Sequence, residues 1–262
     1  MTLSKDLYAV VTGAGGGLGK AYAIQLAHRG YNLILVSLPN EGLNELASEL
    51  RSTYRIDVLF REIDLTLMEN VISLAQWIND SYKVALLVNN AGIGGSQSFV
   101  EASHRYISRI IQLNVTATTL LSRELLPNLL RQNSSYILNV SSIAAFIPTG
   151  YKTVYPATKS FIYSFSRGLN AELSGKGVSV CVVHPGPMRT NLEISSRIDR
   201  QGWFAKILLN EPEEVAKLSL EGLFKCKSVI IPNRWASVLL NLIPKDISIP
   251  LLTKSIKKEL AL

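Results

Sequence analysis

The residues best suited to do chemistry lie between Ser142 and Lys159, in the stretch SIAAFIPTGYKTVYPATK. Tyr155 and Lys159 are four residues apart, so they project from one face of a helix if Pro156 opens that helix. An ammonium beside a phenol favours phenolate, so Lys159 is expected to lower the pKa of Tyr155 from its usual value of roughly 10. The hydroxyl of Ser142 can hydrogen-bond a substrate oxygen that gains negative charge. The Tyr–Lys pattern alone is weak, because the same spacing also describes a core edge and a solvated charge.

A glycine-rich turn near the N-terminus indicates a nucleotide site. The short apolar run LYAVVTG (Leu7–Gly13) predicts a strand, and AGGGLGKAYAIQLAHRG predicts a helix that ends at Gly30. Glycines at a strand-to-helix turn let the backbone approach a pyrophosphate, and the helix N-terminus directs N–H groups toward it. The residues expected to contact a dinucleotide here are Gly13, Gly15, Gly17, Leu18 and Gly19.

Strands and helices alternate along the chain, which predicts one α/β domain over residues 1–262, built on a parallel, doubly wound sheet. Further strands are expected at Tyr31–Ser37, Asp57–Leu65, Val84–Gly92, Ser134–Ser142 and Gly177–Pro187, with SVIIP as an edge strand. Helices are expected at Glu41–Tyr54, Met68–Tyr82, 101–131 (with a break near Pro127) and Thr153–Ser174. Ligands of such sheets bind at the carboxyl ends of the strands, where all these motifs fall.

The same rule selects the other residues expected to contact the cofactor. They are Ser37, Asp64, Leu65, Asn90, Ala91, Gly92, Pro185 and Gly186. Asp64 is equally compatible with capping the next helix. The second strand ends in Ser37-Leu38-Pro39, which contains no acid to repel a 2′-phosphate and no arginine to bind one. NADP(H) is therefore favoured over NAD(H), with Lys20 or Arg61 as the nearby cation.

The composition and charge of the chain exclude several classes of protein. The 262 residues are 47% hydrophobic, as in a globular domain, and the net charge of +7 suits phosphorylated cofactors, acyl thioesters or an anionic membrane surface. Cys181 and Cys226 have neither metal-ligand spacing nor a disulfide pattern. The start MTLSKDLYAVVTG lacks the long apolar core of a secretory signal, and no run reaches the roughly 18 apolar residues of a spanning helix. We expect a cytoplasmic enzyme with no metal and no nucleic-acid partner.

The region after Thr190 follows the strand–helix pattern less clearly. Residues 188–211 mix charges with Trp203 and Phe204, as expected of a substrate lid or of a surface loop pair. Residues 232–262 combine apolar runs with lysines near the end, a pattern typical of peripheral membrane contact. The alternative is that these segments only pack over the core or at a subunit interface.

Together the motifs TGAGGGLG, Asp64-Leu65, NNAG, YPATK and HPGPMRT resemble the short-chain dehydrogenase/reductase family in order and spacing, over about residues 5–190. The resemblance implies a Rossmann domain, a nicotinamide cofactor with Thr190 at its carboxamide, and a homodimer or homotetramer. It also implies a catalytic tetrad of Asn114, Ser142, Tyr155 and Lys159, in which Tyr155 and Lys159 contact the cofactor as well. Gly16 and Leu38 replace basic residues that many NADP users of the family have.

The start GLGKAYA and YPATKSF resemble the 3-oxoacyl and 17β-hydroxysteroid reductases of lipid metabolism. The expected function is thus NADPH-dependent reduction of a ketone to a secondary alcohol, on a hydrophobic or long-chain 3-oxo lipid such as a 3-oxoacyl thioester or 3-ketosphinganine. The alternatives are an NAD-dependent alcohol or hydroxysteroid dehydrogenase working oxidatively, and a non-catalytic nucleotide-binding protein.

Overall fold

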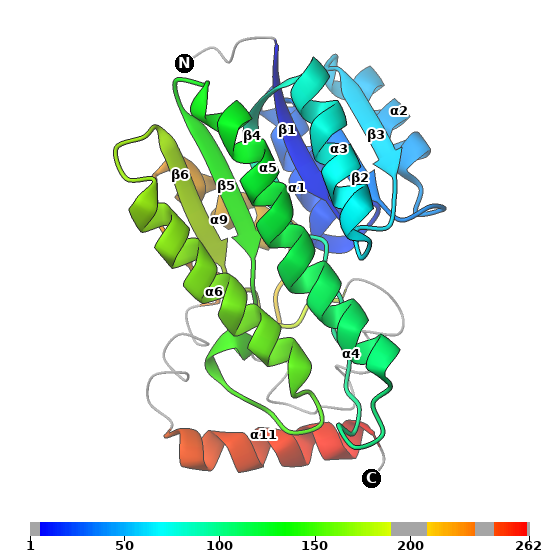
Figure 1. Ribbon diagram of the computed structural model, residues 1–262, viewed down its shortest axis with the longest axis vertical. Helices are drawn as coiled ribbons and strands as arrows, with labels where there is room; N and C mark the ends of the chain where they lie inside the picture. The colour runs from blue at the N-terminus through cyan, green and yellow to red at the C-terminus, as the bar shows by residue number, and fades with distance from the viewer. Residues whose placement is uncertain (1–5, 190–208, 234–243, 261–262) are drawn as a thin grey trace.

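The computed structural model describes residues 6–189, 209–233 and 244–260 (Figure 1). Its strands are β1 (Leu7–Thr12), β2 (Asn32–Ser37), β3 (Val58–Glu62), β4 (Lys83–Asn89), β5 (Ser135–Val140), β6 (Val178–Val183) and β7 (Val229–Ile230). They form one sheet of seven strands in the order β3-β2-β1-β4-β5-β6-β7, and every neighbouring pair is parallel. The predicted doubly wound α/β fold is confirmed, with SVIIP as the edge strand β7.

Helices cover both faces of the sheet (Figure 1). They are α1 (Gly17–His28), α2 (Leu43–Tyr54), α3 (Met68–Ser81), α4 (His104–Ile111), α5 (Thr118–Leu130), α6 (Val154–Glu172), α9 (Pro212–Phe224) and α11 (Lys245–Glu259). Helices α1, α2 and α9 contribute to one buried cluster, whereas α3 and α5 contribute to the other. Within a strand, neighbouring side chains enter opposite clusters, as Val10 and Val11 do, because strand side chains alternate between faces. The sheet is therefore packed between the two buried clusters, which hold its strand ends in place.

The predicted helical segment 101–131 differs from expectation in one respect. It does not break at Pro127, which lies inside α5. The irregularity lies earlier, in a π-helical segment from Gln112 to Ala117 between α4 and α5. Such segments widen the helix by one residue and are frequent at functional sites. This one contains Asn114.

Several strands are shorter than predicted, and this moves their motif residues into loops. β3 ends at Glu62, so Asp64 and Leu65 follow the strand, and β4 ends at Asn89, so Asn90 to Gly92 follow it. These residues therefore lie beyond the paired part of the sheet, in the loops at its carboxyl edge.

The C-terminal helix α11 lies across the end of the molecule toward which β5 points (Figure 1). It contacts the loop before α6, where the backbone N–H of Gly150 donates to Thr253 Oγ1 at 3.0 Å. Within the described part of the chain, no helix is both long and apolar enough to cross a membrane. Most of the predicted lid lies outside the described residues, but its two ends meet, since Met188 and Asn210 form a β-bridge.

Candidate active site

Tyr155 and Lys159 lie in the first turns of α6, at the carboxyl edge of the sheet. The Lys159 ammonium is 5.7 Å from the centroid of the Tyr155 ring. The lysine is buried, and its Nζ donates to the backbone oxygen of Val140 at 2.9 Å, at the end of β5. The Ser141 hydroxyl donates to the backbone oxygen of Lys159 at 2.8 Å. These bonds fasten the start of α6 to the end of β5.

Ser142 lies beside this pair, directly after β5. It is the N-cap of a short 3₁₀ helix, where its Oγ accepts from the Ala144 N–H at 3.2 Å. Its backbone oxygen is 3.0 Å from Nδ1 of the buried His184, which is packed against the rings of Phe146 and Tyr163. The Ser142 side chain also hydrogen-bonds the phenol of Tyr155, which brings the two groups expected to face a substrate oxygen together.

The electrostatics of the pair differ from the expectation. Burial raises the pKa of Tyr155, and the hydrogen bond to Ser142 opposes that rise. Burial also lowers the pKa of Lys159 to about 8, because the charged ammonium loses its hydration. The expected lowering of the Tyr155 pKa by Lys159 is therefore not seen. The helical spacing was predicted correctly, but the spacing does not reveal how deeply the two groups are buried.

The lowered pKa of Lys159 makes stability depend on pH. Between about 8 and the ordinary 10.5, the unfolded chain holds a proton on Lys159 that the folded chain has lost. Stability contributed by this residue therefore rises with pH through that window. We expect the free energy of unfolding of wild type, relative to Lys159→Met, to be higher at pH 10 than at pH 7.5 in urea titrations. A pH-independent difference would contradict burial as the cause.

Asn114 lies in the π-helical segment and connects three elements. Its Oδ1 accepts from the Ile93 N–H at 2.9 Å, and its Nδ2 donates to the Ile93 oxygen at 2.9 Å and to Thr158 Oγ1 at 3.0 Å. Thr158 in turn donates to the backbone oxygen of Tyr155 at 2.7 Å. Both amide hydrogens thus have protein partners, so a water held by this side chain would have to donate to Oδ1.

The loop after β4 lies tightly against these groups. A Cβ added at Gly92 would be 3.1 Å from Asn114 Oδ1 and 3.3 Å from Lys159 Nζ. A Cβ at Gly94 would be 3.2 Å from the Tyr155 ring. The NNAG motif predicted Gly92 as a site residue, whereas Gly94 was missed, since a glycine outside a motif gives no sign of its neighbours.

The glycine turn has the shape that a dinucleotide needs. A Cβ at Gly19 would lie 1.8 Å from the backbone oxygen of Gly13, so helix and turn are in direct backbone contact. Gly13 and Gly17 have left-handed φ angles of 66° and 49°. The N-cap of α1 is Gly16, which has no side chain to satisfy the first N–H groups of the helix. An open helix N-terminus behind a glycine turn fits a pyrophosphate.

Thr12 and Asn90 join the turn to the neighbouring strand end. The Thr12 hydroxyl accepts from the backbone N–H groups of Asn90 and Ala91, both at 3.0 Å. In return, Asn90 Nδ2 donates to the backbone oxygens of Thr12 and Gly13. Asn90 was predicted as a site residue and Thr12 was not. The missed signal was a hydroxyl placed directly before the first glycine of the turn.

The carboxylate of Glu41 lies beside the end of β2, which the sequence analysis did not predict. Ser37 is buried, and its hydroxyl donates to the carboxylate of Glu41. A Cβ added at Gly15 would be 2.5 Å from Glu41 Cβ and 3.0 Å from its Oε2. The premise that no carboxylate lies near this turn is wrong, because the loop after β2 folds Glu41 back onto the strand end.

The remaining predicted residues lie at the same edge. Asp64 Oδ1 accepts from the Thr66 N–H at 2.9 Å, so it closes a turn instead of capping α3, whose N-cap is Leu67. Leu65 is buried. Pro185 accepts from the Ile143 N–H at 3.0 Å, and the Gly186 N–H donates to Asn210 Oδ1 at 2.7 Å. Thr190 lies outside the described residues.

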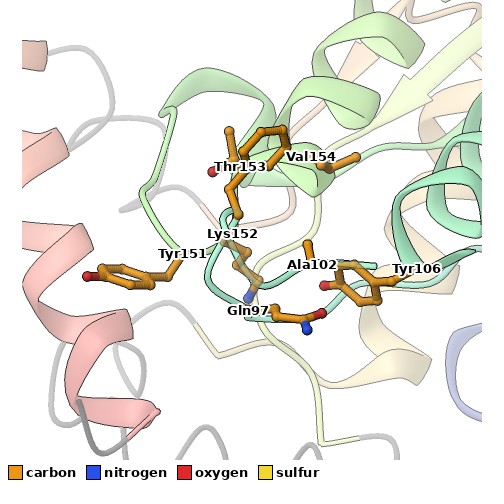
Figure 2. Close-up of a pocket in the computed structure, with 8 residues that line it drawn as sticks. Gln97, Ala102, Tyr106, Tyr151, Lys152, Thr153 and Val154 are labelled. Atoms are coloured by element: carbon orange, nitrogen blue, oxygen red, sulfur yellow. The ribbon is translucent and has the colours of Figure 1, made fainter. Parts of the chain in front are cut away.

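A small pocket is lined in part by the residues that directly precede Tyr155 in the chain (Figure 2). Its lining is Gln97, Phe99, Ala102, Tyr106, Tyr151, Lys152, Thr153 and Val154. Tyr151 has a left-handed φ of 59°, and its backbone oxygen accepts from the Gln97 N–H at 2.6 Å. Figure 2 shows the Tyr151 ring pointing away from this lining toward α11. Lys152 Nζ is 5.7 Å from the Tyr155 ring centroid, so the pocket combines apolar surface with a cation near the candidate acid.

Comparison with known proteins agrees with this arrangement. Residues 7–201 match the family model described as short chain dehydrogenase. The very-long-chain 3-oxoacyl-CoA reductase of Anas platyrhynchos is 34% identical over 194 residues, which are 72% of this chain and 62% of that protein. The chain thus spans about three fifths of the length of this curated relative.

Two solved structures extend the match over nearly the whole chain. The short-chain dehydrogenase from Sphingobium yanoikuyae in complex with NADPH is 32% identical with a TM-score of 0.77, covering 90% of this chain and 96% of that one. The bulky-bulky ketone specific alcohol dehydrogenase from Comamonas testosteroni is 29% identical with a TM-score of 0.76, covering 91% and 95%. The chain therefore belongs to the short-chain dehydrogenase/reductase family, whose members are oxidoreductases that act on alcohol and keto groups and bind NAD(P)(H).

Proposed function

We propose that this protein reduces a ketone to a secondary alcohol with a nicotinamide cofactor. The observation that supports this most is the grouping of a hydroxyl, a phenol and an amine, from Ser142, Tyr155 and Lys159, at the carboxyl edge of the sheet. Oxidation of NAD(P)H against a panel of ketones tests the proposal. A protein that binds the nucleotide but turns over no ketone would instead support the non-catalytic alternative.

Each side chain has a distinct proposed role. Tyr155 is the general acid that donates a proton to the carbonyl oxygen, and Ser142, which hydrogen-bonds it, holds that oxygen. Lys159 stabilises the phenolate that remains, because an ammonium lowers the cost of that charge once it forms. Asn114 positions Thr158 and the Ile93 loop and offers Oδ1 to a water. The bound cofactor supplies the hydride, and positioning by these groups supplies much of the rate.

The proposed cofactor site uses the glycine turn and the strand ends. Its residues are Gly13, Gly15, Gly17, Leu18, Gly19, Ser37, Asp64, Leu65, Asn90, Ala91, Gly92, Tyr155, Lys159, Pro185, Gly186 and Thr190. The motif reading favours NADP(H) for this site, and the NADPH complex of the Sphingobium relative agrees with that reading. The carboxylate of Glu41 argues against NADP(H), because it accepts from the Ser37 hydroxyl at the end of β2, where its charge would repel a 2′-phosphate.

We propose a long-chain lipid ketone as substrate, either a 3-oxoacyl thioester or a 3-keto sphingoid base. Two features support a large apolar substrate: the name of the 3-oxoacyl-CoA reductase relative, and the exposed apolar side chains of Phe99, which lines the pocket, and of Val100 beside it. The net charge of +7 suits the phosphates of a thioester carrier. Residues 188–211 are the proposed lid, supported by the joined ends at Met188 and Asn210.

A chain-length series of 3-oxo substrates tests this assignment. Each buried methylene contributes roughly 0.8 kcal/mol, so kcat/KM should rise about threefold to fourfold per carbon until the pocket is filled. Steady-state rates at fixed, saturating reduced nucleotide give the series. A flat series, or faster turnover of a small sugar or quinone, would contradict the lipid assignment and leave the ketoreductase.

The partners proposed for the chain are a second copy of itself and a membrane surface. The family resemblance implies a homodimer or homotetramer, which sedimentation at micromolar concentration tests. The tail 232–262 is proposed to contact an anionic bilayer peripherally from a cytoplasmic location. The described part of that tail exposes Ile247 and Leu251 together with Lys254, Lys257 and Lys258 along α11. Equal sedimentation with neutral and anionic vesicles would contradict this contact.

A further inference from the structure

The loop before α6 directs Lys152 into the pocket beside the candidate acid. Lys152 is one of the residues that line this pocket, and its Nζ lies 5.7 Å from the centroid of the Tyr155 ring. Figure 2 shows its side chain directed into the lining, whereas the ring of the neighbouring Tyr151 points toward α11. Lys159 Nζ lies at the same distance from the Tyr155 ring, but only Lys152 of the two lines the pocket. Lys152 is therefore the cation that a substrate in this pocket would meet.

Hydrogen bonds to two other segments hold the loop that carries Lys152. The backbone oxygen of Tyr151 accepts from the Gln97 N–H at 2.6 Å, which connects the loop to the segment after β4. The Gly150 N–H donates to Thr253 Oγ1 at 3.0 Å, which connects the loop to α11. Because these bonds lie directly before Lys152 in the chain, the backbone that carries the ammonium has a defined position relative to the pocket.

The surroundings of Lys152 are positive. Among the described residues that line the pocket, none is acidic. Helix α6 begins directly after Thr153, has no acid in its first turn, and has no side-chain hydrogen bond from Thr153 as a cap. The positive end of the helix dipole therefore adds to the ammonium instead of offsetting it. A lysine at a helix N-terminus is unfavourable for the helix itself, and this arrangement favours a ligand with oxygen acceptors.

We propose that Lys152 makes this enzyme specific for 3-oxoacyl derivatives, by binding the second carbonyl oxygen of a substrate whose ketone faces Tyr155. This inference rests on the proposed ketoreductase and chooses between its two candidate lipid substrates. In a 3-oxoacyl thioester one CH₂ group separates the ketone from the thioester carbonyl, whose oxygen can accept a hydrogen bond. An ammonium has three N–H donors, so Lys152 can bind this oxygen in addition to its contacts within the protein.

The same charge disfavours the 3-keto sphingoid base. That substrate has an amino group on the carbon next to its ketone, and such an amine is protonated near neutral pH. With the ketone at Tyr155, this second cation would enter the pocket that Lys152 lines, where no acid of the described lining offsets either charge. Like charges placed together disfavour a complex. Selectivity thus comes from an attraction to one substrate and a repulsion of the other.

The experiment measures kcat/KM of wild type, Lys152→Met and Lys176→Met for three ketones of equal chain length. The first is a 3-oxoacyl N-acetylcysteamine thioester, which contains no phosphate; the second is the simple ketone without the thioester group; the third is the 2-amino-3-ketone. Methionine keeps a long unbranched side chain and removes the charge. Lys176 is exposed in the turn before β6, at the opposite edge of the sheet, so its replacement changes the net charge equally.

The expected result is a change in the ratio of two rates. The intrinsic reactivity of each ketone is the same for every variant, so a change in the ratio of thioester to simple ketone reports on Lys152. A hydrogen bond to a charged group contributes enough for this ratio to fall at least roughly tenfold in Lys152→Met. The amino ketone should become a better substrate of that variant relative to the simple ketone. Lys176→Met should keep the wild-type ratios, and so should Lys152→Arg, which retains the charge and the donors.

The outcomes separate this inference from the proposed function. An unchanged ratio in Lys152→Met, an equal fall in Lys176→Met, or a wild type that prefers the amino ketone to the thioester would overturn the role of Lys152 and leave the ketoreductase intact. If wild type reduces none of the three ketones, the ketoreductase fails and the specificity fails with it. Thermal unfolding and a nucleotide titration of each variant show whether the fold and the cofactor site are intact.

Discussion

Replacement of Tyr155 by Phe is expected to abolish turnover and to leave nucleotide binding nearly unchanged. The change removes one oxygen, the one that hydrogen-bonds Ser142, and keeps the ring against which Gly94 is packed. General acid catalysis contributes typically about 10²- to 10⁴-fold, so kcat should fall by at least roughly a hundredfold. The glycine turn that binds the nucleotide is untouched. Steady-state kinetics and a separate nucleotide titration measure the two effects.

A matched control is Tyr163→Phe, which removes a phenol two turns further along the same helix. Tyr163 stacks edge-on against His184, with ring centroids 5.1 Å apart, and that contact does not need the hydroxyl. We expect this variant to keep nearly normal kcat. Retention of more than about a hundredth of wild-type kcat in Tyr155→Phe would mean that another group donates the proton.

Replacement of Gly19 by Ala is expected to disrupt the nucleotide site. The new Cβ would lie 1.8 Å from the Gly13 oxygen and 2.6 Å from its carbonyl carbon, and both atoms are backbone that cannot rotate away. Helix α1 must move off the turn. Overpacking of this kind costs typically about 1–3 kcal/mol of stability. The nucleotide Kd should rise at least roughly tenfold, because about 1.4 kcal/mol of lost interaction is a factor of ten.

Gly168→Ala is the control for this change. Gly168 lies in α6, away from the turn, and a Cβ there meets no heavy atom of the described residues within 4 Å. We expect this variant to keep at least the wild-type melting temperature and to leave the nucleotide affinity unchanged. Equal behaviour of the two variants, in either direction, would show that close contact between turn and helix does not govern binding.

The sequence by itself determined the order of the elements and the location of the site edge. Apolar runs of strand length and helical periodicity are local signals, so β1 to β6 and their helices could be predicted to within a few residues. In a parallel doubly wound sheet all carboxyl ends share one edge, so the motifs after those strands had to converge. The spacing of Tyr155 and Lys159 was enough to place both on one face of α6.

Only the tertiary structure decided how these groups are buried and what lies beside them. Glu41 and Gly15 are far apart in sequence, and only the reversals at Asn40 and Gly42 bring them together. The pKa shifts of Tyr155 and Lys159 follow from burial, which depends on every element packed around α6.

The tertiary structure also decided the backbone conformation around Asn114 and the position of the C-terminal helix. The π-helical segment at Gln112–Ala117 has no local sign, since its extra residue is accommodated by contacts with Ile93 and Thr158. The bond from Gly150 to Thr253 joins residues separated by 103 positions. Local pattern fixes which element a residue belongs to, whereas contacts between distant segments, which no local pattern encodes, decide the charge and the neighbours of each site residue.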